Sequence, residues 1–351
     1  MTRHFRSTET EAQARGREFG TRHAAEIRRS TELYDALFAR VAGHPIDTRA
    51  IGAEALARIS RFSPPLATEL HGMAVGAAID PTRLAALNAR TEILARSGAR
   101  SRGECSTVVR IDPWSSSALA VQTWDWYAEF AGQWLVWEMP RPDGGRVITV
   151  TEFGILGKAG VNSGGLGLLF NILHHRRDGG ELGVPVHVLA RALLDGNGDI
   201  NQALQRVHAT PVSASSCMTL VSARDGASLA VAVEVHPGGP ALVFPDAQGL
   251  LVHTNHFLAP AVAADDLEPS MYPDTQIRHD LLMRRMRGRP ATRAAALEAM
   301  RSHLGGPAAV CCHPDPAQPS AGQYETLATL VLDVAKGSLE ALPGGPCGHP
   351  D

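Results

Sequence analysis

The character of the chain changes near residue 100, and this change constrains the fold most. Before it, apolar side chains recur every three or four positions; from Thr107 onward, short apolar runs are separated by Gly, Pro and Asp. The first pattern is typical of helices that bury one face, and the second of strands joined by turns. The sequence therefore predicts a helical N-terminal segment followed by a strand-rich unit.

The N-terminal segment contains several predicted helices. Apolar stripes favour a long helix over about 19–41 and a second over about 51–59. Two further helix starts are marked by an N-cap residue followed by proline, at Ser63-Pro64 and at Asp80-Pro81.

The strand-rich unit mixes strands and helices without regular alternation. We expect strands over 107–111, 118–124, 146–153, 166–171, 218–222, 229–235, 250–253 and 324–334, and helices over 184–194, 200–207, 274–286 and 291–303. Without βαβ alternation, this order favours packed antiparallel sheets covered by helices, an α/β (α+β) fold.

Composition excludes some classes of protein. The 351 residues are 44% hydrophobic and carry a formal net charge of −3, so no overall field favours nucleic acid or an anionic membrane. No apolar stretch reaches the roughly 18 residues of a membrane span. The five cysteines are an odd number and no leader precedes them, so we expect a cytoplasmic protein without a disulfide framework.

Cys105 is the candidate nucleophile, because it stands where the helical segment gives way to the first strand. A cysteine within a chain has an ordinary thiol of pKa about 8.5 and no built-in base. If the bond before it is cut, the new α-amine, of pKa about 7.7–8.0, can accept the thiol proton. The alternative is a buried strand cysteine, which the local sequence alone favours.

Polar residues further along the chain favour a nucleophile over a buried strand cysteine at position 105. Asp125 lies between Trp124 and Trp126, where burial is costly unless its carboxylate is paired, and a newly formed α-ammonium is a suitable partner. Asn162 lies in a glycine-rich stretch, 154–166, and its side chain can donate to an oxygen; the alternative is that this stretch only forms a glycine-rich hairpin. Asn255 follows a strand, where its amide can donate to a developing oxyanion, although turn chemistry explains it as well.

In order and spacing, these elements resemble the acyl-coenzyme A:6-aminopenicillanic acid acyltransferase family of the N-terminal nucleophile superfamily. The family pattern has a Cys after a short Gly/acidic turn, then Gln-x-Trp-Asp, Gly-x-Asn-x-x-Gly-Leu and Thr-Asn-His. The resemblance covers nearly the whole chain, including 16–20, 88–93, 183–191 and 343–347. It implies a four-layer αββα sandwich, with 1–104 as a helical pro-segment or α subunit and 105–351 as the catalytic β subunit of one compact unit.

The resemblance also implies roles for individual residues. Glu104–Cys105 would be the self-cleaved bond, and Cys105 the nucleophile with its freed amine as base. Asp125 would orient that amine, Asn255 would build the oxyanion hole, and Asn162 would assist. We expect substrate contacts from five further residues: Gln122, Trp124, Trp126, His256 and Arg278.

One stretch departs from the family pattern. Where an Ile-Cys-Arg-His-like sequence is expected, this chain has Cys312 in place of the arginine. The loss of a fixed cation would alter self-processing or recognition of a carboxylate-bearing substrate. Arg278, Arg284 and Arg285 are candidates to replace it, although solvated helix charges are the commoner case.

The predicted activity is hydrolysis or transfer of acyl groups from small amides or thioesters, with no cofactor required. A zinc or redox protein using Cys311, Cys312 and His313 is an alternative. We expect no metal site there, since neighbouring side chains in a strand point in opposite directions and no second ligand pair stands nearby. A binding protein that has lost self-cleavage is another alternative. Expected partners are the substrate and the two fragments, without nucleic acid or membrane; homo-oligomerisation is left open.

Overall fold

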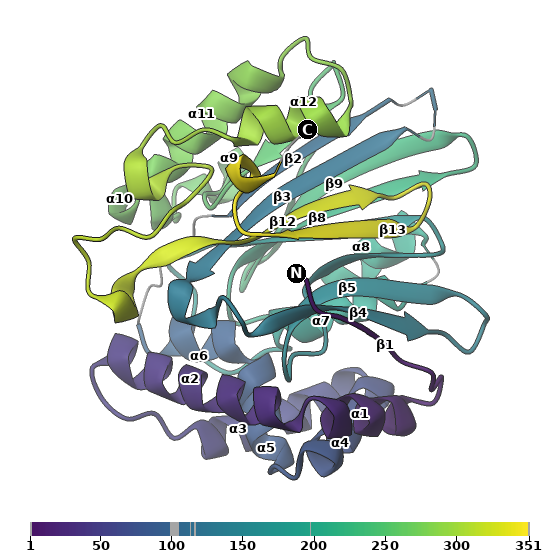
Figure 1. The fold of residues 1–351 in the computed structure, drawn as a ribbon, viewed down its shortest axis with the longest axis vertical. Coiled ribbons are helices and arrows are strands. Elements are labelled where there is room, and N and C mark those ends of the chain that lie inside the picture. Colours follow the sequence, from purple (N-terminus) through teal and green to yellow (C-terminus); the bar gives the residue numbers. More distant parts are fainter. Residues whose placement is uncertain (1, 99–104, 113, 116, 197, 350–351) are drawn as a thin grey trace.

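The computed structural model describes residues 2–98, 105–112, 114–115, 117–196 and 198–349. Its N-terminal part begins with a short strand, and the rest of this part is helical (Figure 1). The elements are β1 (His4–Arg6), α1 (Ala12–Arg22), α2 (Ala24–Ala42), α3 (Thr48–Phe62), α4 (Pro64–Ala77), α5 (Pro81–Asn88) and α6 (Arg90–Arg96).

The helical segment was predicted correctly, but two helices are each divided in two. The long predicted helix breaks at His23, and the helix that starts after Asp80 breaks at Ala89. As expected, the Asp80 carboxylate caps its helix by accepting from the backbone N–H of Thr82 at 2.9 Å.

Glycines allow α1 and α4 to pack with their backbones almost in contact. A Cβ added at Gly16 would lie 1.9 Å from the carbonyl oxygen of Glu69, and one at Gly72 would lie 2.1 Å from that of Gln13. No side chain fits at such distances, so the two helices depend on glycine at these positions.

Replacing Gly16 with alanine should therefore destabilise the protein by about 1–3 kcal/mol, because the helices must separate. In an open helix the same change would stabilise by about 1 kcal/mol. Gly132→Ala is the matched control, because nothing lies within 4 Å of its added Cβ. Urea unfolding of both variants measures the difference, and a Gly16→Ala variant as stable as the control would contradict this packing.

The strand-rich part forms two sheets. The larger has the order β1-β4-β5-β6-β7-β8-β9-β10, and the smaller β11-β2-β3-β12-β13. Apart from the parallel pair β1–β4, neighbouring strands are antiparallel. The strands of residues 105–349 are β2 (Ser106–Ile111), β3 (Ala118–Tyr127), β4 (Trp134–Pro140), β5 (Arg146–Glu152), β6 (Ala159–Asn162), β7 (Leu166–Ile172), β8 (Ser216–Arg224), β9 (Ala227–His236), β10 (Gly239–Val243), β11 (Leu250–His253), β12 (Tyr324–Asp333) and β13 (Ser338–Pro343).

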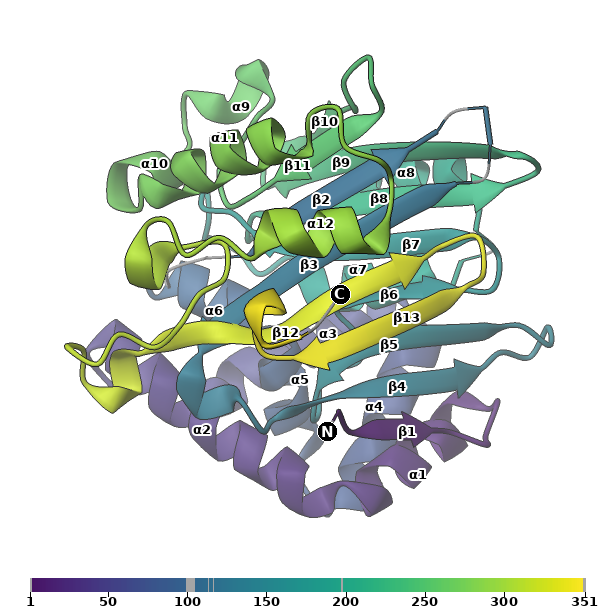
Figure 2. The ribbon, with the colours of Figure 1, turned by 45° about the horizontal axis from the view of Figure 1, so that its top comes forward.

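The two sheets stack face to face between helical layers (Figures 1 and 2). Helices α7 (Val186–Leu194) and α8 (Ile200–His208) pack on the larger sheet. Helices α11 (Asp274–Met286) and α12 (Arg293–Met300) pack on the smaller sheet. This arrangement confirms the predicted α/β fold with two sheets between helices.

Short helices complete the chain: α9 (Pro260–Ala263), α10 (Glu268–Met271) and the 3₁₀ turns η1 (Ala128–Phe130), η2 (Gly306–Ala308), η3 (Ser320–Gly322) and η4 (Pro346–Gly348). Among the residues that the structure describes, no helix combines the length and the apolar character needed to cross a membrane.

A buried ion cluster joins the helical segment to the strand-rich part. Glu69 of α4 is fully buried and accepts two 2.9 Å hydrogen bonds from Arg191 of α7. It also pairs with Arg15 of α1. Three helices, two before residue 105 and one after it, are thus held by one carboxylate.

Candidate active site around Cys105

Cys105 lies directly before β2, next to the two strands that carry the other predicted residues. Strand β2 pairs with β3 so that Ser106 faces Thr123, and with β11 so that Thr107 faces His253. One residue beyond the β2–β3 register, Cys105 lies opposite Trp124, next to Asp125. Two residues beyond the β2–β11 register, Cys105 lies opposite Asn255. The separated motifs of the sequence therefore meet at one end of the smaller sheet.

Within the residues that the structure describes, three polar groups lie against Cys105. Its Sγ lies 3.8 Å from the backbone oxygen of Asp125. Its carbonyl oxygen accepts hydrogen bonds from Asn171 Nδ2 and from Arg278 Nη1, each at 3.1 Å. Cys105 is only 5% exposed, so these contacts lie in a protected environment.

Arg278 is the fixed cation of the site. It projects from α11 and is buried, and its Nη2 donates to Asn255 Oδ1 at 3.2 Å. One guanidinium therefore bridges the nucleophile residue and the expected oxyanion donor. Of the arginines considered as replacements, Arg284 instead pairs with the exposed Asp280, and Arg285 donates to backbone carbonyls of α12.

Asn255 is held so that its amide faces the site. Its Nδ2 donates to the carbonyl of Ile172 at 2.9 Å, and its backbone N–H donates to Thr275 Oγ1 at 2.9 Å. Because Arg278 donates to Oδ1 and the Ile172 carbonyl accepts from Nδ2, two partners fix the orientation of this amide.

Asn162 lies away from this site, contrary to the prediction from the sequence. Its Nδ2 donates to the carbonyls of Leu194 and Gly196, and its Oδ1 accepts from Gly164 and Leu166 in the hairpin turn. Leu166 lies five residues along β7 from Asn171, about 17 Å at the usual strand rise. Asn162 therefore shapes the β6–β7 turn.

Asn171, which the sequence analysis missed, occupies the position expected for Asn162. It is a buried amide within β7, a strand whose other side chains are apolar. A polar side chain inside such a run is costly without a partner. A polar residue inside this apolar run was therefore the signal by which Asn171 could have been recognised as a site residue from the sequence.

The predicted substrate contacts are buried inside the protein. Gln122 Nε2 donates to Thr107 Oγ1 at 2.8 Å, to the carbonyl of Phe170 at 2.9 Å and to Asn171 Oδ1 at 3.2 Å. It therefore joins the two sheets and orients Asn171. Trp124 and Trp126 are 2% and 1% exposed.

His256 supports the turn that carries Asn255. Its Nδ1 lies 3.2 Å from Thr254 Oγ1 and 3.0 Å from Thr275 Oγ1. Burial lowers the pKa of His256 to about 3, so the ring is neutral at physiological pH. Neither of these hydrogen bonds reaches Cys105, and Glu104 lies outside the residues that the structure describes.

A second group of charges, also missed from sequence, lies behind the site. Glu152 at the end of β5 pairs with Arg90 at 3.0 Å and with Lys158 at 3.1 Å, and accepts from Tyr34. Lys158 Nζ lies 3.7 Å from the centre of the Trp124 ring. Burial lowers the pKa of Lys158 to about 7, against the opposing effect of Glu152.

The thiol of the uncut chain is strongly protonated. Burial and the nearby Asp125 carboxylate raise the pKa of Cys105 to about 11, and the Asp125 backbone, Lys158 and Arg278 offset this only in part. Cys105 thus lacks thiolate character until a further positive charge or a base is placed beside it.

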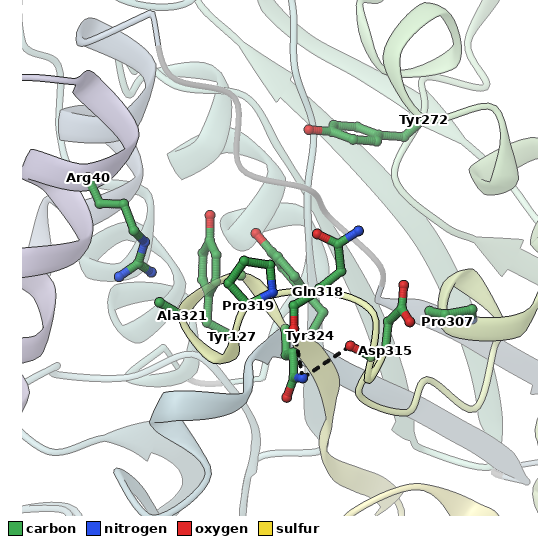
Figure 3. Close-up of a pocket in the computed structure, with 11 residues that line it drawn as sticks. Arg40, Tyr127, Tyr272, Pro307, Asp315, Gln318, Pro319, Ala321 and Tyr324 are labelled. Carbon is green, nitrogen blue, oxygen red and sulfur yellow. Dashed lines mark hydrogen bonds between the residues drawn. The ribbon is translucent and has the colours of Figure 1, made fainter.

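A cavity of about 500 Å³ opens near the same end of β3 (Figure 3). Tyr127, at the end of β3, lies about 10 Å along the strand from Trp124. Trp126 links the two regions. Its ring packs edge-on against Tyr324, with 6.3 Å between the ring centres, and the guanidinium carbon of Arg90 lies 4.6 Å from the centre of the Trp126 ring. The described residues that line it are Arg40, Tyr127, Tyr272, Pro307, Asp315, Gln318, Pro319, Ala321, Gly322, Gln323 and Tyr324.

Comparison with known proteins agrees with this architecture. The family model of acyl-coenzyme A:6-aminopenicillanic acid acyl-transferase matches residues 115–346. The acyl-coenzyme A:6-aminopenicillanic-acid-acyltransferase 40 kDa form of Emericella nidulans is 28% identical over 245 residues, which are 69% of this chain and 66% of that protein. The match thus spans slightly less than two thirds of that relative's length.

Two solved structures are more distant. The Caenorhabditis elegans orthologue of N-acylethanolamine-hydrolyzing acid amidase is 13% identical, with a TM-score of 0.46, over 68% of this chain and 100% of that one. Penicillin V acylase from Agrobacterium tumefaciens is 15% identical, with a TM-score of 0.46, over 68% of this chain and 83% of that one. The family model covers well over half of the sequence, and the chain belongs to the acyl-coenzyme A:6-aminopenicillanic acid acyl-transferase family.

Proposed function

We propose that the protein cuts its own backbone before Cys105 and then uses this cysteine to hydrolyse or transfer acyl groups of small amides or thioesters. The observation that carries the proposal is the convergence of Asn171, Arg278 and Asn255 on Cys105. They come from three separate parts of the chain, and a structural cysteine needs no such set.

Self-cleavage would begin with attack of Cys105 Sγ on the carbonyl carbon of Glu104. The C–N bond breaks as the C–S bond forms, and the nitrogen takes up the thiol proton. Water then hydrolyses the thioester to give a Glu104 carboxylate and a free Cys105. The fragments 1–104 and 105–351 would remain together as one unit.

The cut would activate the nucleophile. The new α-amine has an ordinary pKa of about 7.7–8.0 and lies on the same residue as the thiol, so it can take the thiol proton. Its positive charge then opposes the burial that holds the thiol pKa near 11 in the uncut chain. The Asp125 carboxylate is buried and raises the pKa of the Cys105 thiol by its charge, and its proposed role is to orient this ammonium.

In turnover, the Cys105 thiolate attacks the substrate carbonyl and the leaving amine or thiol departs with a proton. Asn255 Nδ2 donates to the oxyanion, while Arg278 holds the Asn255 amide in orientation. The S-acyl enzyme then passes its acyl group to water or to an amine. The cavity beside Tyr127 and Tyr324 is the proposed place for the substrate body.

The test is the fragment pattern of freshly purified protein. We expect two chains on a denaturing gel, with Cys105 as the first residue of the larger, and one uncut chain for Cys105→Ala. Incubation with a short-chain acyl thioester should add one acyl mass to the larger fragment, removed by hydroxylamine. A single wild-type chain, or cleavage that persists in Cys105→Ala, would overturn the proposal. The matched control is Cys217→Ala, a buried cysteine on β8.

A further inference from the structure

We propose that His303, Cys311, His313 and Cys347 bind one zinc ion. These residues lie in three segments: after α12, after η2 and in η4. One ligand atom from each residue lies within 4.8 Å of the others. The sequence analysis expected no second ligand pair near Cys311 and His313, and the fold supplies one from residues 303 and 347.

The distances fit a tetrahedral cation. With bonds of about 2.0–2.1 Å to nitrogen and about 2.3 Å to sulfur, tetrahedral ligand atoms lie about 3.3–3.8 Å apart. His313 Nε2 lies 3.1 Å from His303 Nε2, 3.6 Å from Cys311 Sγ and 3.4 Å from Cys347 Sγ. All three distances are close to the edges of such a tetrahedron.

Hydrogen bonding alone does not account for this convergence. A neutral imidazole nitrogen carries either one proton or one lone pair, so it can form one good hydrogen bond in the ring plane. Nε2 of His313 has three close polar neighbours. A cation at their centre accepts a lone pair from each of the four atoms.

The surrounding backbone holds the segments in place. The Cys311 N–H donates to the carbonyl of Ser302 at 3.0 Å, which joins the first two segments. Arg301 Nε donates to the carbonyl of Pro346 at 3.3 Å, which joins the third. Cys312 turns away and its Sγ lies 3.0 Å from the carbonyl of Pro307, so it is not a ligand.

The ligand set identifies the metal and its role. Two thiolates and two imidazoles in tetrahedral arrangement are typical of zinc, and four protein ligands leave no position for substrate, as in structural sites. The proposed ion would fix the segment that contributes Pro307 and Asp315 to the cavity wall. It would also anchor the C-terminal turn to this segment.

The experiment measures zinc in protein purified without a metal-affinity tag and dialysed in metal-free buffer. We expect about one zinc per wild-type chain by mass spectrometry of the elements. Cys347→Ser and His303→Ala should lose most of it, and Cys312→Ser, the matched control, should retain it. Circular dichroism establishes that each variant is folded.

Cobalt provides a second readout. After chelation of the native metal, one equivalent of Co²⁺ should give wild type the strong visible absorption of a tetrahedral site, with a thiolate charge-transfer band. Both signals should be largely lost in Cys347→Ser, which binds the metal weakly and keeps one of two thiolates. The proposal is overturned if folded wild type neither contains nor binds zinc, if Cys311 and Cys347 form a disulfide instead, or if the variants bind as wild type does. None of these outcomes depends on self-cleavage.

Discussion

Replacing Asn255 with alanine should lower the rate of acyl transfer by about 10²–10³, because it removes a buried oxyanion donor. The same change leaves the Arg278 guanidinium without its Asn255 Oδ1 acceptor. The rate of Cys105 acylation by a chromogenic short-chain acyl thioester, measured on cleaved protein, reports the chemical step directly.

Asn162→Ala is the matched control for Asn255→Ala. Asn162 is also a buried asparagine, but its hydrogen bonds are to the β6–β7 turn and to the carbonyls of Leu194 and Gly196 at the end of α7. The Asn162→Ala variant should have a lower free energy of unfolding, while the acylation rate of the folded variant stays within a few-fold of the wild-type rate. If Asn162→Ala lowers the acylation rate strongly and Asn255→Ala does not, the wrong asparagine has been assigned to the site.

Replacing Glu69 with glutamine should destabilise the protein by about 3–5 kcal/mol, since it leaves Arg15 and Arg191 without their buried counter-charge. The control is Glu26→Gln, which removes a partner of the exposed Arg3 and should cost at most about 1 kcal/mol. Urea unfolding of uncut Cys105→Ala protein carrying each change gives the comparison. Equal losses in the two variants would refute the structural importance of the cluster.

The same carboxylate predicts a dependence on pH. Burial alone would raise the pKa of Glu69, but Arg191 and Arg15 bring it below its ordinary value of 4.5. A lowered pKa in the folded state adds stability above pH 4.5 and loses it as the pH falls toward the folded pKa. Wild type should therefore lose more stability than Glu69→Gln on acidification below pH 4.5.

The parts of the fold that follow local rules were predictable from sequence. The Asp80-Pro81 start signal and the apolar stripe of α3 predicted helices in the right places, and apolar runs bounded by turn residues predicted the strands β2, β3, β7 and β12. The missed strands are β1, β4, β6, β10 and β13, which include both edges of the larger sheet and one edge of the smaller. Gly239–Val243 is short and begins with Gly-Pro, so it carries a weak strand signal, whereas Trp134–Pro140 contains the apolar run Trp-Leu-Val-Trp and could have been recognised.

The site was only partly predictable, because much of it depends on distant contacts. Cys105, Asp125 and Asn255 are adjacent through strand register, which motif order anticipated. Arg278 reaches the site only because α11 lies across β2 and β11, and Asn171 only because the larger sheet stacks on the smaller. Neither relation is encoded by spacing along the chain.

The parallel pairing of β1 with β4 has a practical consequence for a chain that is cut at residue 104. His4–Arg6 would then be a strand donated by one polypeptide to the sheet of another. Halves produced separately should complement each other through this donated edge and the shared carboxylate of Glu69. Recombining a variant half with a wild-type half would allow changes on the two sides of the cut to be tested independently.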